Sequence, residues 1–145
     1  NGQKNQAKKQ LENIINKKNN IYSPLSLFLI IDKDLEQNNT VIIKYFDQIL
    51  SINNLDKEDI NLIKLKKAIF ISENGKEQDI LELLNPVINS NSVWKLQSAK
   101  FLGDYYFSLK QLKKAKEYYL VIINEKTEDL DTNEIRRRIN IIDNE

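Results

Sequence analysis

The 145-residue chain contains no cysteine, histidine or methionine, and it has only three glycines and two prolines. Without cysteine and histidine it cannot form disulfides, thiolate nucleophiles or the usual zinc sites, and it lacks the side chain most used for proton transfer near neutral pH. So few glycines leave no phosphate-binding glycine loop and disfavour an all-β fold with many tight turns. We therefore expect a non-enzymatic protein with no catalytic residues, no cofactor and no metal site.

The chain also lacks an excess of one charge, because its 22 Lys and Arg nearly balance its 21 Asp and Glu, for a net charge of +1. This balance argues against a generally basic nucleic-acid-binding domain, so we expect no nucleic-acid partner. The longest uninterrupted apolar run, Leu27 to Ile31, is far shorter than the ~20 residues that span a bilayer. The length indicates a single domain over residues 1–145. Since the chain has no initiator methionine, we expect it to be a fragment of a longer protein.

Apolar residues recur at three- and four-residue spacing almost throughout, which predicts helices and no strands. Ser23 is expected to cap the second helix with Pro24 at its first position, and Asn74-Gly75 to end the fourth. Short connections between successive helices predict antiparallel neighbours. The predicted helices cover about residues 3–17, 23–37, 40–50, 56–71, 78–88, 93–109, 112–124 and 132–143.

One helical pair, over about residues 96–129, carries a specific pattern of small and aromatic residues. Leu102 and Gly103 are followed by Tyr106 in its first helix, and Ala115 is followed by Tyr119 in its second. Small residues let two helices cross closely, and the two tyrosines then fill the space around the crossing. This pattern resembles the tetratricopeptide repeat.

Degenerate earlier copies support a repeat architecture. Ala68 lies 35 residues before Gly103, and Ile30 lies 38 residues before Ala68, which brackets the ~34-residue period of such repeats. We therefore predict an all-α, tetratricopeptide-like, right-handed α-α superhelix. It comprises about three helical hairpins, an N-terminal helix and a C-terminal capping helix over residues 132–143.

A closer resemblance covers about residues 8–142. Pro86 follows a run of leucines, a short Asn/Ser loop comes next, Trp94 opens the following hairpin, and the closing helix is arginine-rich. This combination is similar to the tetratricopeptide-like domain of the ancillary SecYEG translocon subunit (YfgM-like) family. The resemblance implies an inner-membrane protein with one N-terminal membrane anchor and a periplasmic repeat domain near the translocon and periplasmic chaperones. A cytoplasmic location remains the alternative.

Stacked hairpins present the first helix of each pair on a concave surface, which is the candidate binding groove. Its mixed apolar and charged lining suits an extended peptide or a partner helix. By the repeat register, the groove is lined by Gln97, Lys100, Phe101, Asp104, Phe107 and Ser108, and one repeat earlier by Ile69, Ser72 and Glu73.

Two remaining features have ordinary structural explanations. Acidic pairs such as Asp56 with Asp59 occur at predicted helix starts, where capping explains them. The run Arg136 to Arg138 is favoured as a solvated face over an anion site. The predicted function is thus a non-catalytic protein–protein interaction module, associated with the translocon or a periplasmic chaperone. The alternatives are a structural module that forms a homodimer and, less favoured, a binder of anionic lipid or RNA.

Overall fold

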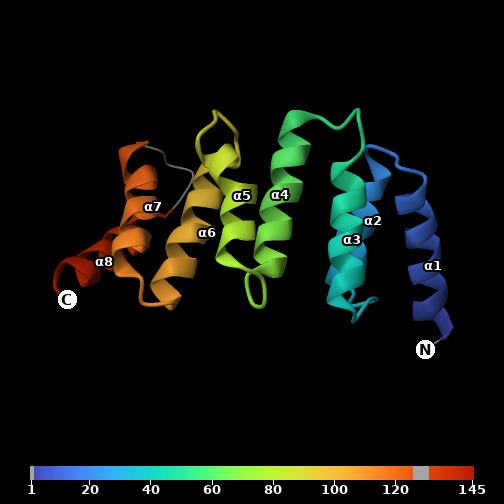
Figure 1. Ribbon diagram of the computed structural model, residues 1–145, viewed down its shortest axis with the longest axis horizontal. Coiled ribbons are helices and arrows are strands. Elements are labelled where there is room, and N and C mark those ends of the chain that lie inside the picture. The colour runs from blue at the N-terminus through green and yellow to red at the C-terminus, as the bar shows by residue number, and fades with distance from the viewer. Residues whose placement is uncertain (1, 126–130) are drawn as a thin grey trace. The chain divides into compact units, whose positions relative to one another are not determined.

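The computed structural model describes residues 2–125 and 131–145, and the regular elements there are all α-helices (Figure 1). The predicted all-α class is confirmed, and each predicted helix is found. Their bounds are α1 (Gly2–Asn16), α2 (Tyr22–Asp32), α3 (Asn39–Leu50), α4 (Lys57–Ile71), α5 (Glu77–Ile88), α6 (Lys95–Ser108), α7 (Leu112–Asn124) and α8 (Thr132–Asp143). Residues 126–130, where the hairpin predicted over 96–129 ends, lie outside the described residues.

The chain divides into two compact units, Asn1–Ile63 and Lys64–Glu145, and the division falls within α4. Each unit has a core of its own and is described by itself. That residues 1–145 form one domain stays a prediction, as does the handedness of the superhelix.

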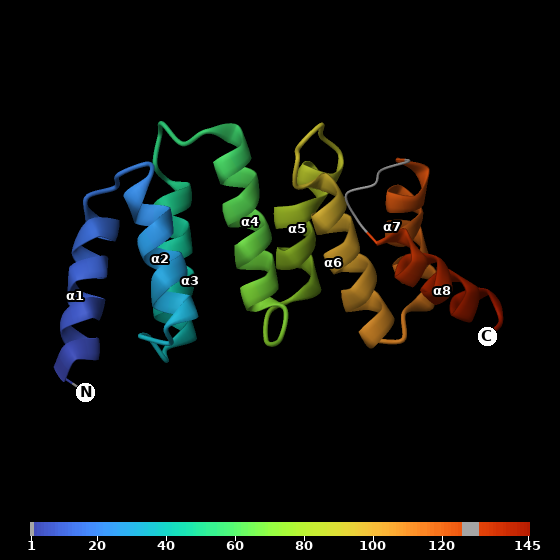
Figure 2. The same cartoon turned by 180° about the vertical axis from the view of Figure 1, so that it is seen from behind.

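In the first unit, α1, α2 and α3 pack side by side (Figure 2). Their contact is made by fully buried side chains, among them Ile15, Leu27 and Phe46. Burial of each such side chain contributes about 1.5–3 kcal/mol. Polar contacts add to the α1–α3 interface, because the Tyr45 hydroxyl donates to Glu12 Oε1 at 2.6 Å.

The start of α2 differs from the prediction. Ser23 lies inside the helix, fully buried, and its hydroxyl donates to the Ile14 carbonyl at 2.9 Å. The capping role belongs to Asn19, whose Oδ1 accepts from the backbone N–H groups of Ile21 and Tyr22. The prediction that Ser23 is the N-cap of α2 was therefore wrong, because its hydroxyl forms a hydrogen bond to the end of α1.

The end of α2 also differs, since the helix stops at Asp32 and not near residue 37. Asp34 adopts a left-handed backbone with φ of 52°. The N–H groups of Asp34 and Leu35 donate back to the carbonyls of Ile31 and Ile30, which is the Schellman pattern of a helix C-terminus. The local turn thus ends the helix, although apolar spacing continues.

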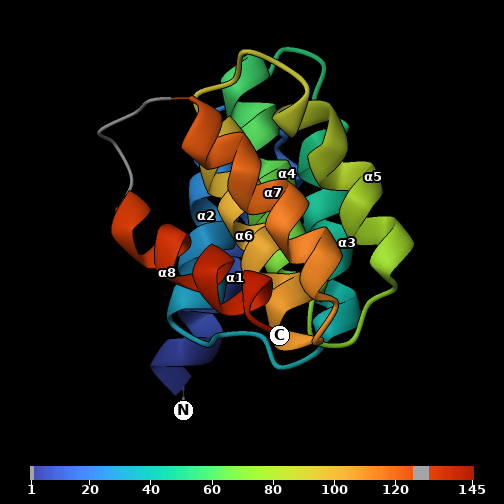
Figure 3. The same ribbon diagram turned by 90° about the vertical axis from the view of Figure 1, so that its left-hand side faces the viewer.

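In the second unit, α6 and α7 pack against each other (Figure 3). Gly103 and Ala115 are both buried at their interface, as the repeat pattern predicted. A Cβ added to Gly103 would lie 2.5 Å from Cε1 of Tyr119, so the aromatic ring occupies the space that the glycine leaves. The pair is joined by a tight turn at Lys110, which has φ of 60°.

The last helix, α8, crosses α7 obliquely (Figure 3). Asp131 caps it, as its Oδ1 accepts from the Asn133 N–H at 2.9 Å. Ile135 is its buried apolar residue, and an ion pair between Lys116 and Asp143 ties its end to α7. This position fits the predicted terminal cap of the α6–α7 hairpin.

Two features of α4 and α5 have local explanations. α4 ends at Ile71, and a Cβ on Gly75 would lie 2.6 Å from the Ile71 carbonyl oxygen, so glycine is needed for this close approach. Pro86 lies in the last turn of α5, and the helix continues to Ile88. The proline therefore limits the last turn without ending the helix at once.

Candidate functional site

The predicted groove residues of α6 do not all face open solvent. Asp104 pairs with Lys100 one turn earlier, with Oδ2 2.6 Å from the Lys100 ammonium. Its Oδ1 accepts from the Tyr119 hydroxyl and from Arg138 Nη1 of α8, both at 2.8 Å. The Arg138 guanidinium also lies 5.2 Å from the centre of the Phe107 ring. The structure thus joins Lys100, Asp104 and Phe107 in one cluster that α8 contacts.

The other predicted residues of α6 have separate environments. Phe101 stacks on Tyr105 with ring centres 6.4 Å apart, and Ser108 is exposed, with its hydroxyl donating to the Tyr105 carbonyl. The side-chain oxygen of Gln97 is buried and accepts no hydrogen bond within residues 2–125 and 131–145. That oxygen is therefore a free acceptor in the described chain.

The second part of the predicted groove consists of residues on and after α4. Ile69 is 45% exposed, Ser72 donates to the Ile69 carbonyl at 2.7 Å, and Glu73 is exposed. Within the described residues, no hydrogen bond or ion pair joins these three to the set on α6. That these three residues and the set on α6 line one groove stays a prediction.

The arginine run splits into different roles. Arg136 and Arg137 are exposed, whereas Arg138 is held by Asp104, by Tyr119 and, at 2.6 Å, by Glu134 of its own helix. Two carboxylates thus neutralise Arg138, which serves to attach α8.

The tyrosines of the hairpin are core residues. Tyr106 and Tyr119 are buried, and Tyr106 stacks parallel to Tyr118 with ring centres 5.7 Å apart. Burial raises the pKa of the Tyr119 phenol; the hydrogen bond from Arg138 opposes this, and the bond to Asp104 adds to it. The ordinary core reading of these aromatic rings is therefore correct, and they do not offer stacking faces to a ligand.

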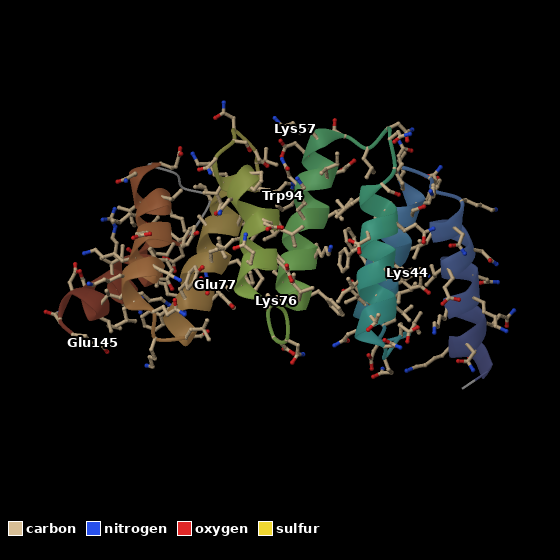
Figure 4. All side chains as sticks on the ribbon, viewed as in Figure 1. Lys44, Lys57, Lys76, Glu77, Trp94 and Glu145 are labelled. Atoms are coloured by element: carbon tan, nitrogen blue, oxygen red, sulfur yellow. The ribbon has the colours of Figure 1, made fainter. Side chains whose placement is uncertain are left out.

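An electrostatic cluster ties α5 to this core. Glu77, at the start of α5, faces α6 (Figure 4) and accepts from the Tyr106 hydroxyl and from Lys114 of α7, both at 2.7 Å. The hydrogen bond from Lys114, followed by that from Tyr106, lowers the pKa of Glu77. An ionised Glu77 therefore holds α5, α6 and α7 together.

Among the described residues, the largest group of exposed apolar side chains was not singled out from the sequence. It consists of Ile21, Tyr22, Leu25 and Leu29, hereafter the α2 face, with exposures of 59%, 62%, 56% and 42%. One signal in the sequence points to it, because α2 carries apolar residues on all sides and lacks a polar face for solvent.

Two depressions adjoin the α2 face within the first unit. One, of about 170 Å³, is mostly apolar, and its lining includes Pro24, Phe28 and Leu62. The other, of about 550 Å³, has a mixed polar and apolar lining that includes Lys17 and Lys18. An apolar surface with a pocket and a basic border is suited to binding another polypeptide.

Over residues 2–125 and 131–145, no three acidic side chains gather as a metal site would require. In the same ranges, none of the helices combines the length and the apolar character that crossing a bilayer demands.

Comparison with known proteins identifies a relative. No protein-family model matches the chain, and no solved structure does. The chain is 34% identical over 154 aligned positions to the ancillary SecYEG translocon subunit of Buchnera aphidicola subsp. Schizaphis graminum. The alignment covers 94% of this chain and 73% of that protein. The identity and coverage confirm the resemblance found in the sequence, and the chain belongs to the family of ancillary SecYEG translocon subunits.

Proposed function

We propose that this chain is a non-catalytic protein-interaction module of a translocon-associated protein. The observation that carries the proposal is the 34% identity, over 94% of the chain, to a subunit whose name places it with SecYEG. The α2 face adds support, because an apolar surface of this kind on a soluble domain marks a site of association.

The environments of the carboxylates favour binding over catalysis. Asp56 caps α4 by accepting from the Glu58 N–H, and Asp131 caps α8. Glu36 and Glu77 pair with lysines, whose hydrogen bonds lower the pKa of both carboxyls. A general acid near neutral pH needs the opposite shift, which burial away from cations would produce. These side chains therefore act in structure.

We further propose that the contact surface includes the groove predicted on α4 and α6. Its exposed members are Ile69, Glu73 and Ser108. The expected occupant is a segment of the translocon or of a periplasmic chaperone. The finer placement, a periplasmic domain on a single membrane anchor, rests on the family resemblance.

Photocrosslinking in living cells tests the function. A photoreactive residue is placed in the full-length protein at Ile69 or Ser108, with Lys113 on the exposed side of α7 as the matched control. We expect adducts with SecYEG subunits or a periplasmic chaperone from the two groove positions and not from Lys113. Background adducts at all three positions, together with no co-purification of SecYEG, would refute the proposal.

The location is tested by cysteine labelling, because residues 1–145 contain no cysteine and any other cysteine of the full-length protein can be replaced by serine. In the full-length Ser108→Cys protein, a membrane-impermeant maleimide should label the thiol in cells whose outer membrane alone is opened. Labelling that requires lysis of the inner membrane would place the domain in the cytoplasm.

A further inference from the structure

The α2 face is a continuous stripe. At about 100° per residue of helix, its four side chains fall within an arc of about 100°. Four large apolar residues lie within nine positions of the chain, and each is at least 42% exposed. Soluble proteins normally scatter such residues singly, so this concentration indicates a surface that is covered in the assembled state.

The size and lining of the apolar depression beside the stripe determine which kind of ligand can enter it. Pro24, Leu25 and Phe28 form one wall from α2, and Leu62 and Ile63 form the other from α4. Its volume of about 170 Å³ is below the ~300–1,000 Å³ of a typical small-molecule pocket. A single large apolar side chain fits this size, so the pocket is suited to one anchor residue of a protein.

The larger depression, whose lining is mixed, supplies positive charge to the binding surface. Lys17 and Lys18 follow the last residue of α1 and are exposed, and within the described chain neither forms an ion pair. Proximity to the helix C-terminus favours cations there but leaves the ammonium groups in solvent. Asn20 lines both depressions, so the basic site and the apolar pocket are contiguous.

We propose that the α2 face docks an amphipathic helix of a protein partner, with one large apolar side chain in the pocket and an acidic side chain against Lys17 and Lys18. The inference rests on the proposed function, because it names the chemistry of a partner of that module. Helix docking in an apolar groove uses anchors at three- and four-residue spacing, which the stripe can match.

Two other occupants fit less well. An anionic membrane would bring negative charge against Asp59 at the pocket and against Asp32 at the far end of α2, both exposed. A second copy paired antiparallel would bring Asp32 and Asp34 to Lys17 and Lys18 together with Lys33, which cancels part of their charge. A helix whose acidic residues are confined to its first turn brings more negative charge to the two lysines and adds none along the pocket.

The test uses synthetic helical peptides and the purified full chain, so it does not depend on the translocon. The probe carries three leucines on one face and glutamates in its first turn. One matched peptide has glutamine for each glutamate, and another has alanine for each leucine. Fluorescence anisotropy measures the affinity of each peptide for the chain.

We expect the glutamate peptide to bind about tenfold more tightly than either matched peptide. The difference between the glutamate and glutamine peptides should disappear in a Lys17→Gln/Lys18→Gln chain and persist in the control Lys113→Gln. Leu25→Ser should weaken binding about tenfold, while Leu109→Ser, at a site 48% exposed in the second unit, should not. Tyr22→Ser is a second variant in case Leu25→Ser alters the fold.

The alternatives give different results. Equal affinity of all three peptides, or binding unchanged by both Leu25→Ser and Tyr22→Ser, would overturn the proposal. Adsorption to phosphatidylglycerol vesicles that Leu25→Ser abolishes, without peptide discrimination, would assign the face to lipid. A Leu25-dependent dimer in sedimentation velocity would assign it to a second copy. Failure of the peptide test with intact co-purification of SecYEG would reject this surface and retain the proposed function.

Discussion

Substitution of Gly103 by alanine should destabilise the second unit, although alanine is the better helix former. The added Cβ would lie 2.5 Å from Cε1 and 2.6 Å from Cδ1 of the Tyr119 ring. Ordinary contacts begin near 3.4 Å, so the ring must move by about 1 Å. Tyr119 is fully buried and its hydroxyl bonds to Asp104 and Arg138, so the ring has little room to yield.

The expected magnitude follows from two opposing effects. Alanine gains about 1 kcal/mol over glycine in helix propensity. Overpacking in a closed core costs about 1–3 kcal/mol, and the locked ring places this site at the upper end. We expect Gly103→Ala to lower the free energy of unfolding by about 1–2 kcal/mol.

Urea unfolding followed by circular dichroism measures the effect, with Gly2→Ala as the control because nothing lies within 4 Å of that added Cβ. A double-mutant cycle assigns the cause, since the penalty of Gly103→Ala should largely vanish in a Tyr119→Leu background. An unchanged or increased stability of the single variant would refute the close packing of α6 on α7. The same penalty in both backgrounds would show that the ring is not its source.

Three further predictions concern α8, a turn and the tyrosines. Arg138→Ala should cost about 1 kcal/mol and speed hydrogen exchange in α8, because the cation–π contact and the bonds to α6 are lost. Lys110→Gly should stabilise the chain by about 1 kcal/mol in urea unfolding, since glycine tolerates φ of 60°. Burial raises the pKa values of the Tyr45, Tyr106 and Tyr119 phenols. The stability that these buried phenols provide is therefore complete below pH 10 and is lost as the pH rises through the raised pKa values. Absorbance at 295 nm in an alkaline titration measures the ionisation of the three phenols.

Apolar periodicity predicted the helices well, because the spacing of apolar residues along the chain directly gives the buried face of each helix. Tyr106 and Tyr119 were placed in the core for the same reason, and the structure buries both. The start of α2 could not be predicted in this way. A tertiary bond from Ser23 to the Ile14 carbonyl decides which residue caps the helix.

The candidate surfaces were harder to predict than the fold. Register placed Asp104 and Phe107 on the outward side of α6, but it does not say which other part of the chain contacts that side. In the structure, Arg138 of α8 contacts both. The α2 face was missed because a helix that is apolar all round gives no polar side from which its orientation can be read.

Direct binding to purified SecYEG tests the central claim most plainly. The full-length protein is titrated with SecYEG in lipid nanodiscs, and empty nanodiscs of the same lipid serve as the reference. The account predicts saturable binding to the SecYEG discs alone. Equal binding to both kinds of disc, or to neither, would contradict a translocon-associated interaction module.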